Sequence, residues 1–135
     1  MNCPGSVCND AMTQLYMAWG LQPMSNNNPV FDTAFYALLF RIGSFLFGTD
    51  NGGVALNTFV QLLLFSFSFA HFTEIVFELT HSKTKTAFLI CFYMINPIFG
   101  GAVQIMLKDS LHLSVFILYI SYLLKLQKGA YLEKA

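Results

Sequence analysis

Residues 53–79 of the chain read GVALNTFVQLLLFSFSFAHFTEIVFEL, a long apolar run on which the expected fold depends. It contains no lysine or arginine, and its first acidic residue is Glu74. A helix needs about 20 mostly apolar residues to cross a bilayer, so the stretch predicts a transmembrane helix. Asn57, Gln61 and Ser68 follow one another at spacings of four and seven and share one stripe of that helix. We expect the stripe to face protein rather than lipid.

The composition of the whole chain points the same way. Of 135 residues, 56% are hydrophobic, 16% aromatic and 10% charged, and seven basic residues balance seven acidic ones. A soluble domain carries about 25% charged residues, so this chain has too few charges to cover a globule in water. Disordered chains are polar and charged, and nucleic-acid binders carry a basic excess. The sequence therefore predicts an integral membrane protein.

Two further spans are expected after the first, over residues 86–105 and 111–127. Asn96-Pro97 should kink the earlier one, because proline cannot continue a helix in the ordinary way. Residues 1–28 form the polar part of the chain and predict an outer loop that contains one short helix, from Asp10 to Gly20. The prediction is an all-α membrane protein, a helical bundle with three spanning helices plus one amphipathic juxtamembrane helix over residues 29–48.

The juxtamembrane helix allows a second interpretation. At 100° per residue its polar residues fall within about a third of the circumference of the helix. Phe40 is the apolar exception in that sector. These polar residues are Asp32, Thr33, Tyr36, Gly43 and Ser44. Such a helix can lie in the membrane interface, or it can span with its polar face turned to a bundle, which gives four spans.

The positive-inside rule is compatible with both topologies. If the helix lies at the surface, Lys83, Lys85 and the C-terminal lysines fall inside, while residues 1–52 and Lys108-Asp109 fall outside. If the helix spans, the rule is obeyed with the N-terminus inside. The amphipathic pattern favours the surface helix, and hence a multi-pass protein of the cell membrane with its polar candidates on the extracytoplasmic side.

Those polar candidates are Asp10, Lys108 and Asp109. Two carboxylates and a lysine at a membrane surface can activate a hydroxyl, hold a metal or hold a phosphate. Each aspartate can also be an ordinary helix N-cap. His71 and His112 stand alone in the sequence and are expected to be packed or interfacial.

Cys3 and Cys8 flank a Pro-Gly pair near the N-terminus. A disulfide is one reading if that end faces an oxidising compartment, and two free thiols are the other. Their spacing suits neither a zinc site nor a redox motif.

The order of these features resembles the N-terminal part of GT-C-type membrane glycosyltransferases, which use polyprenyl-phosphate-linked sugars. The resemblance rests on three ordered segments: PGSVCNDAMTQLYMAWG (4–20), NNNPVFDTAFYALLFRIGSFLFG (26–48) and MLKDS (106–110), with Asn96-Pro97 ahead of the last. It covers nearly the whole chain and selects the topology with the surface helix. Asn28 stands where related sequences often have a basic residue or a histidine beside the proline.

The resemblance implies a site on the outer face. Asp10 would be the general base on an acceptor hydroxyl, and Asp109 would orient the site or help hold a divalent metal ion. Lys108 would offset the phosphate charge, and Asn28 and Tyr36 would contact substrate. The partners implied are the lipid bilayer and a polyprenyl-phosphate-linked sugar, with no nucleic acid.

The resemblance also implies that the chain is a piece of a longer transferase, running from the first outer loop of the family to about its fourth transmembrane helix. Such a piece is expected to be inactive without the remainder of the protein. Two alternatives stay open: a small non-catalytic multi-span membrane subunit, and a transporter fragment in which the polar stripe of residues 53–79 lines a path.

Overall fold

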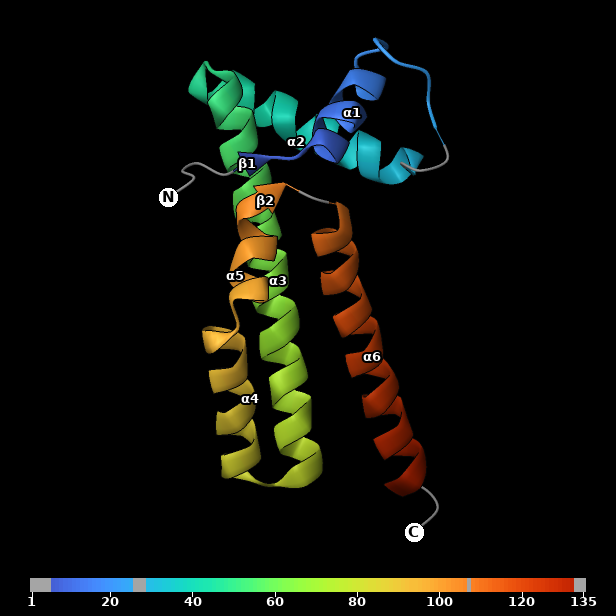
Figure 1. Cartoon of the computed structure of the whole chain (residues 1–135). Coiled ribbons are helices and arrows are strands. Elements are labelled where there is room, and N and C mark those ends of the chain that lie inside the picture. The colour runs from blue at the N-terminus through green and yellow to red at the C-terminus, as the bar shows by residue number, and fades with distance from the viewer. Residues whose placement is uncertain (1–5, 26–28, 107, 133–135) are drawn as a thin grey trace.

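The computed structural model describes residues 6–25, 29–106 and 108–132. The elements in chain order are β1 (Ser6–Val7), α1 (Asn9–Ala18), α2 (Val30–Phe47), α3 (Asp50–Thr80), α4 (Lys83–Ile95), α5 (Pro97–Gln104), β2 (Ile105–Met106) and α6 (Lys108–Leu132). Helix α3 is central, with α4, α5 and α6 running along it and α1 and α2 gathered at one end (Figure 1). The chain is an all-α membrane protein, as the sequence predicts.

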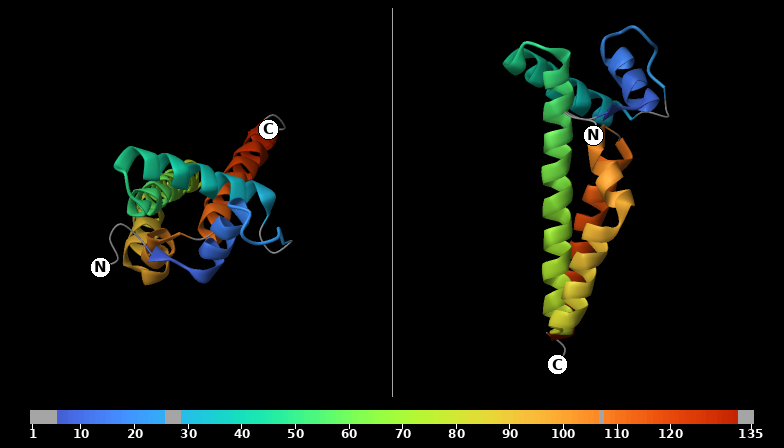
Figure 2. Two further views of the ribbon diagram at one scale, coloured as in Figure 1. Left: turned by 90° about the horizontal axis from the view of Figure 1, so that it is seen from above. Right: turned by 60° about the vertical axis from the view of Figure 1, so that its left-hand side comes forward.

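The orientation of α2 separates it from the spanning helices. By length and composition α2, α3 and residues Asp109–Gln127 of α6 could each cross a membrane. However, α2 runs across the end of α3 rather than alongside it, and both views agree (Figure 1, Figure 2). Spanning helices tilt by only about 20° on average, so the crossing of α2 over α3 favours the predicted surface position of α2 over the four-span alternative. By length and composition alone α2 is a candidate for either.

The span expected over residues 86–105 is two helices instead of one. Helices α4 and α5 have 13 and 8 residues and meet at Asn96, whose ψ of 113° is extended rather than helical. Pro97 causes the break, because its ring disfavours helical backbone at the preceding residue and it has no N–H to donate. The Asn96 Oδ1 accepts a hydrogen bond from the Ile98 N–H at 3.0 Å, which caps α5. The predicted kink is confirmed.

An aromatic cluster supports this break from the side of α3. The ring of Phe69 lies 4.0 Å from Tyr93 of α4 and 5.1 Å from Phe99 of α5, centroid to centroid. Phe65, one turn earlier on α3, lies 5.9 Å from Phe99. Edge-to-face pairs of this kind add to the stabilisation from burial, so one face of α3 holds both halves of the broken helix.

The polar sector of α2 turns inward, not toward water. Asp32, Thr33 and Tyr36 are each buried, and so is Phe40. Phe40 fits this arrangement, because the sector packs against α1 and α3. The Phe40 ring lies 5.7 Å from the Trp19 ring, centroid to centroid. The opposite face exposes large apolar side chains, among them Phe45. Helix α2 is thus amphipathic with an inward polar face and an apolar outer face that suits lipid.

Glycines allow α2 and α3 to cross closely. A Cβ atom on Gly43 would meet the carbonyl oxygen of Gly52 and would lie 2.8 Å from the Gly53 Cα. A Cβ on Gly53 would lie 2.7 Å from the Ser44 Oγ. The chain reverses between the two helices at Gly48, which ends α2 with a left-handed φ of 67°. Backbone therefore packs on backbone at this crossing.

Small polar residues face protein along α3 and α6. The predicted stripe on α3 is confirmed, because Asn57, Gln61 and Ser68 are all buried. On α6 the matching stripe consists of Ser110, Ser114 and Ser121, which the sequence analysis did not single out. Small residues let membrane helices approach closely, and α3 and α6 pack together along much of their length.

Hydrogen bonds from the α3 stripe reach other elements. The Asn57 Nδ2 donates to the Gly53 carbonyl at 3.0 Å and to the Tyr36 carbonyl of α2 at 3.4 Å. The Gln61 Nε2 donates to the Ile105 carbonyl of β2 at 2.9 Å. Strand β2 also pairs in parallel with β1, an interaction between distant segments that no sequence pattern predicted.

The start of α1 corrects one expectation. Cys8, with extended φ and ψ of −84° and 167°, holds the N-cap position, and Asp10 lies inside the first turn. The N-cap interpretation of Asp10 is therefore wrong, although a carboxylate in the first turn still favours the helix through its dipole. The predicted end is confirmed, since Trp19 is the C-cap of α1 and Gly20, the next residue, has a left-handed φ of 73°.

Candidate functional site

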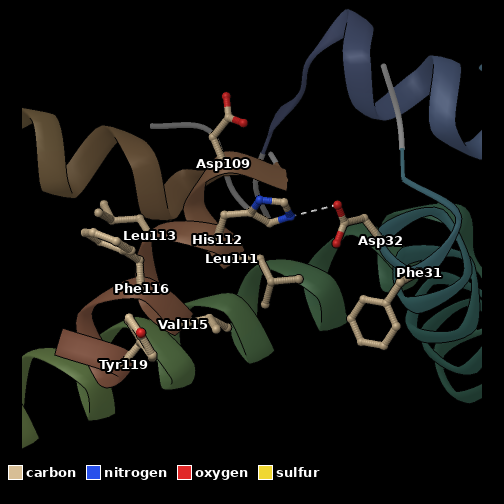
Figure 3. A pocket seen from close by; sticks show the side chains of 9 residues that line it. All are labelled: Phe31, Asp32, Asp109, Leu111, His112, Leu113, Val115, Phe116 and Tyr119. Carbon is tan, nitrogen blue, oxygen red and sulfur yellow. Dashed lines mark hydrogen bonds and ion pairs between the residues drawn. The ribbon is translucent and has the colours of Figure 1, made fainter. Parts of the chain in front are cut away.

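A cavity of about 780 Å³ lies between the start of α6 and the start of α2 (Figure 3). Ligand sites in proteins commonly measure about 300–1,000 Å³. Its lining comprises Phe31 and Asp32 of α2 and, from α6, Asp109, Leu111, His112, Leu113, Val115, Phe116 and Tyr119. The cavity is thus apolar over most of its wall and carries four titratable groups, those of Asp32, Asp109, His112 and Tyr119.

Asp32 and His112 form the polar centre of the cavity. The Asp32 Oδ2 lies 2.8 Å from the His112 Nε2, and these residues are 80 positions apart in the sequence. The Asp32 side chain is only 4% exposed, whereas that of His112 is 56% exposed. A buried carboxylate needs a hydrogen-bonding partner to offset its desolvation, and His112 supplies one while its ring remains open to the cavity.

Local sequence places both groups. Pro29 precedes the first residue of α2 and suits the entry to a helix, so Asp32 falls in the first turn, where the helix dipole favours an acidic side chain. Asp109 likewise falls in the first turn of α6, because that helix begins at Lys108. His112 follows Asp109 by three residues and therefore lies on the same face.

Tyr36 lies one turn along α2 from Asp32 but is not part of the cavity wall. Its side chain is buried, and its hydroxyl has no hydrogen-bond partner among the described residues. Burial raises the pKa of the Tyr36 phenol well above its usual range, and the charge of Asp32 raises it further. The phenol therefore stays protonated, and its burial away from the cavity wall does not bring it to the place where a substrate contact was expected.

The remaining residues expected at the site are distributed as follows. Asp109 lines the cavity. Asp10 is exposed on α1 and is not among the lining residues, although α1 and the start of α6 occupy the same end of the molecule (Figure 1). Asn28 and Cys3 lie outside the described residues, and so does the side chain of Lys108. Within the described part of the chain, no three His, Cys, Asp or Glu side chains gather to hold a metal ion.

The Asp32–His112 pair is the feature that sequence reasoning missed. His112 was expected to be a packed or interfacial histidine, and the sequence analysis gave it no partner, whereas its ring nitrogen bonds Asp32. Asp32, a carboxylate within an otherwise apolar helix, was the signal in the sequence that a polar partner is needed. Nothing in the local sequence indicates that this partner lies 80 residues away.

Fold and cavity together define an all-α membrane protein with a mixed apolar and acidic cavity at one end of its bundle. No protein family, curated protein or solved structure matches the chain.

The contact between Asp32 and His112 should contribute measurably to the free energy of unfolding. We expect a double-mutant cycle of Asp32→Ala and His112→Ala, measured by thermal unfolding in detergent, to give a coupling free energy of about 1 kcal/mol or more. His112→Ala alone should destabilise by about 1–3 kcal/mol, because it leaves the buried carboxylate without this partner. Asp50→Ala, combined with His112→Ala, is the control and should be additive. Additivity in the Asp32 cycle as well would show that the contact contributes nothing to stability.

Proposed function

We propose that this chain forms the outer-face site of a membrane glycosyltransferase that moves a sugar from a polyprenyl-phosphate donor to an acceptor hydroxyl. The cavity between α2 and α6 is the observation that carries the proposal. Its apolar wall suits a lipid chain, and its polar groups stand at the end of the bundle where α2 crosses it. A lipid-linked substrate needs an apolar wall for its chain directly beside polar groups for its head.

The reaction needs a base and a means to stabilise a leaving phosphate. The acceptor hydroxyl attacks the anomeric carbon, the bond from that carbon to the phosphate oxygen breaks, and polyprenyl phosphate leaves. In this proposal Asp10 takes the hydroxyl proton, and its exposure leaves the carboxylate accessible to substrate. Lys108 offsets the phosphate charge, and Asp109, at the cavity wall, orients the acceptor.

Native membranes provide the direct test. Membranes from the source cell and from a strain lacking this reading frame would each receive a panel of polyprenyl-phosphate-linked sugars that are radiolabelled in the sugar. We expect labelled product and free polyprenyl phosphate to form together in the first preparation and to fall in the second. Restoring the reading frame should restore both. Equal transfer of every sugar in the two preparations would contradict the proposal and favour a non-catalytic membrane subunit.

A further inference from the structure

A second cavity, of about 320 Å³, lies between α1 and α2 at the end of the bundle (Figure 1). Its wall is formed by Ala18, the last residue of α1, by Met24 and by one face of α2 that runs from Val30 to Arg41. None of its lining residues belongs to the cavity between α2 and α6. It is a separate site, to which the proposed reaction gives no role.

Arg41 is the charged group of this cavity. A guanidinium stays protonated in proteins, and Arg41 has no ion pair in the part of the chain that the structure describes. The other lining residues are uncharged. Residues 26–28, which lie outside the described part between Met24 and Val30, are asparagines and add no charge. The wall is therefore positively charged, and it suits an anion.

Thr33 provides an unused hydrogen-bond donor at the same cavity. It lines the wall, its side chain is only 1% exposed, and its hydroxyl has no partner among the described residues. A buried hydroxyl without a partner is unfavourable. Side chains of a helix lean toward its N-terminus, so Arg41 leans back toward Thr33, which lies about two turns earlier on α2. An anion that Arg41 holds in this cavity can also accept a hydrogen bond from Thr33.

The rest of the wall is apolar and continues into the outer face of α2. Ala34 and Ala37 leave space along the helix, and Leu38 is exposed and belongs to the apolar face that suits lipid. At 100° per residue, Arg41 falls between the buried Thr33 and the exposed Leu38 on the circumference of α2. An arginine at such a border packs its stem on apolar surface while its charge reaches the lipid head groups.

We propose that the cavity between α1 and α2 binds a membrane lipid whose head group carries a phosphate. Arg41 holds the phosphate by charge and by paired hydrogen bonds, and Thr33 donates to one of its oxygens. The acyl chain lies against Ala37 and Leu38, where the cavity meets the apolar face of α2. The inference does not rest on the proposed function, because such a lipid can hold α1 and α2 at the membrane surface without reacting.

Trp19 can report on this cavity. It is the only tryptophan in the chain, and it directly follows Ala18 in the cavity wall. Bromine atoms on an acyl chain quench tryptophan fluorescence only at short range. The chain in dodecyl maltoside micelles would be titrated with brominated phosphatidic acid and with diacylglycerol that has the same brominated chains. We expect saturable quenching by phosphatidic acid, with an affinity at least about tenfold higher than that of diacylglycerol.

Variants separate the phosphate contact from the cavity itself. Arg41→Gln should weaken phosphatidic acid about tenfold, to the level of diacylglycerol, because the phosphate loses its cation. Arg41→Lys keeps the charge without the planar fork, so its affinity should fall between the parent and Arg41→Gln. Ala37→Leu should fill the cavity and weaken both lipids. Lys85→Gln is the control, since it removes an exposed positive charge from the first turn of α4 at the other end of the bundle, and it should change nothing.

Inorganic phosphate distinguishes a lipid head group from a free ion. Added at the concentration of the brominated lipid, it should leave the quenching unchanged. If it displaces the brominated phosphatidic acid at that concentration, the cavity is a site for free phosphate and the proposed lipid is wrong. Equal affinity of the two lipids overturns the inference as well, and so does a preference for phosphatidic acid that survives in Arg41→Gln.

Discussion

Replacing Asp10 with asparagine is expected to slow sugar transfer by about 10²–10⁴-fold, the usual contribution of a general base. Asparagine keeps the size of the side chain and its capacity to accept a hydrogen bond, but it cannot take a proton at neutral pH. The loss should fall on turnover rather than on the amount of protein, because Asp10 is exposed and its neighbours Ala11 and Leu15 supply the packing of α1.

The measurement compares membranes of the deletion strain carrying either the parent or the Asp10→Asn chain, with protein levels matched by immunoblot. Asp50→Asn serves as the control, since it makes the same chemical change in the first turn of another helix at the same end of the bundle. It should transfer sugar at the parent rate. If Asp10→Asn also transfers at the parent rate, Asp10 has no part in the reaction and His112 becomes the candidate base.

Replacing Gly43 with alanine is expected to destabilise the protein by about 3 kcal/mol, the upper end of the usual range for overpacking. The added Cβ meets the carbonyl oxygen of Gly52 and lies 2.8 Å from the Gly53 Cα, and both belong to the backbone of α3. Flexible side chains can move away from such an atom, but the backbone of a helix cannot. Because native proteins are stable by about 5–15 kcal/mol, this is a large share of the total.

The matched control is Gly100→Ala in α5, where a Cβ would have no heavy atom within 4 Å. Alanine there should leave the melting temperature unchanged or raise it, since glycine inside a helix costs about 0.5–1 kcal/mol relative to alanine. Thermal unfolding in one detergent compares the two variants. Similar melting temperatures for both would show that α2 and α3 can separate without loss, contrary to the close crossing.

Displacement of α2 has a consequence for the cavity as well. Asp32 lies on α2, which the glycine crossing helps to hold across the end of α3, and its Oδ2 lies 2.8 Å from the His112 Nε2. Gly43→Ala should therefore also reduce the coupling free energy between Asp32 and His112 in the double-mutant cycle, even under conditions in which the bundle remains folded.

Elements that depend on neighbouring residues could be predicted from the amino-acid sequence. The apolar run at 53–79 predicted α3, and its stripe of Asn57, Gln61 and Ser68 faces protein. Pro97 broke the following helix where expected, and Gly20 marked the end of α1. Caps, breaks and helical periodicity are local properties, because each is set by residues within about one turn.

The way in which those elements meet depends on contacts between distant parts of the chain. The polar sector of α2 was visible in the sequence, but its inward direction depends on α1 and α3 closing around it. The pairing of Asp32 with His112 spans 80 residues. The local pattern around either residue is compatible with several partners, and the choice among them follows from packing of the whole bundle. The chemistry of the cavity, which joins two distant helices, therefore appears only once the chain is folded.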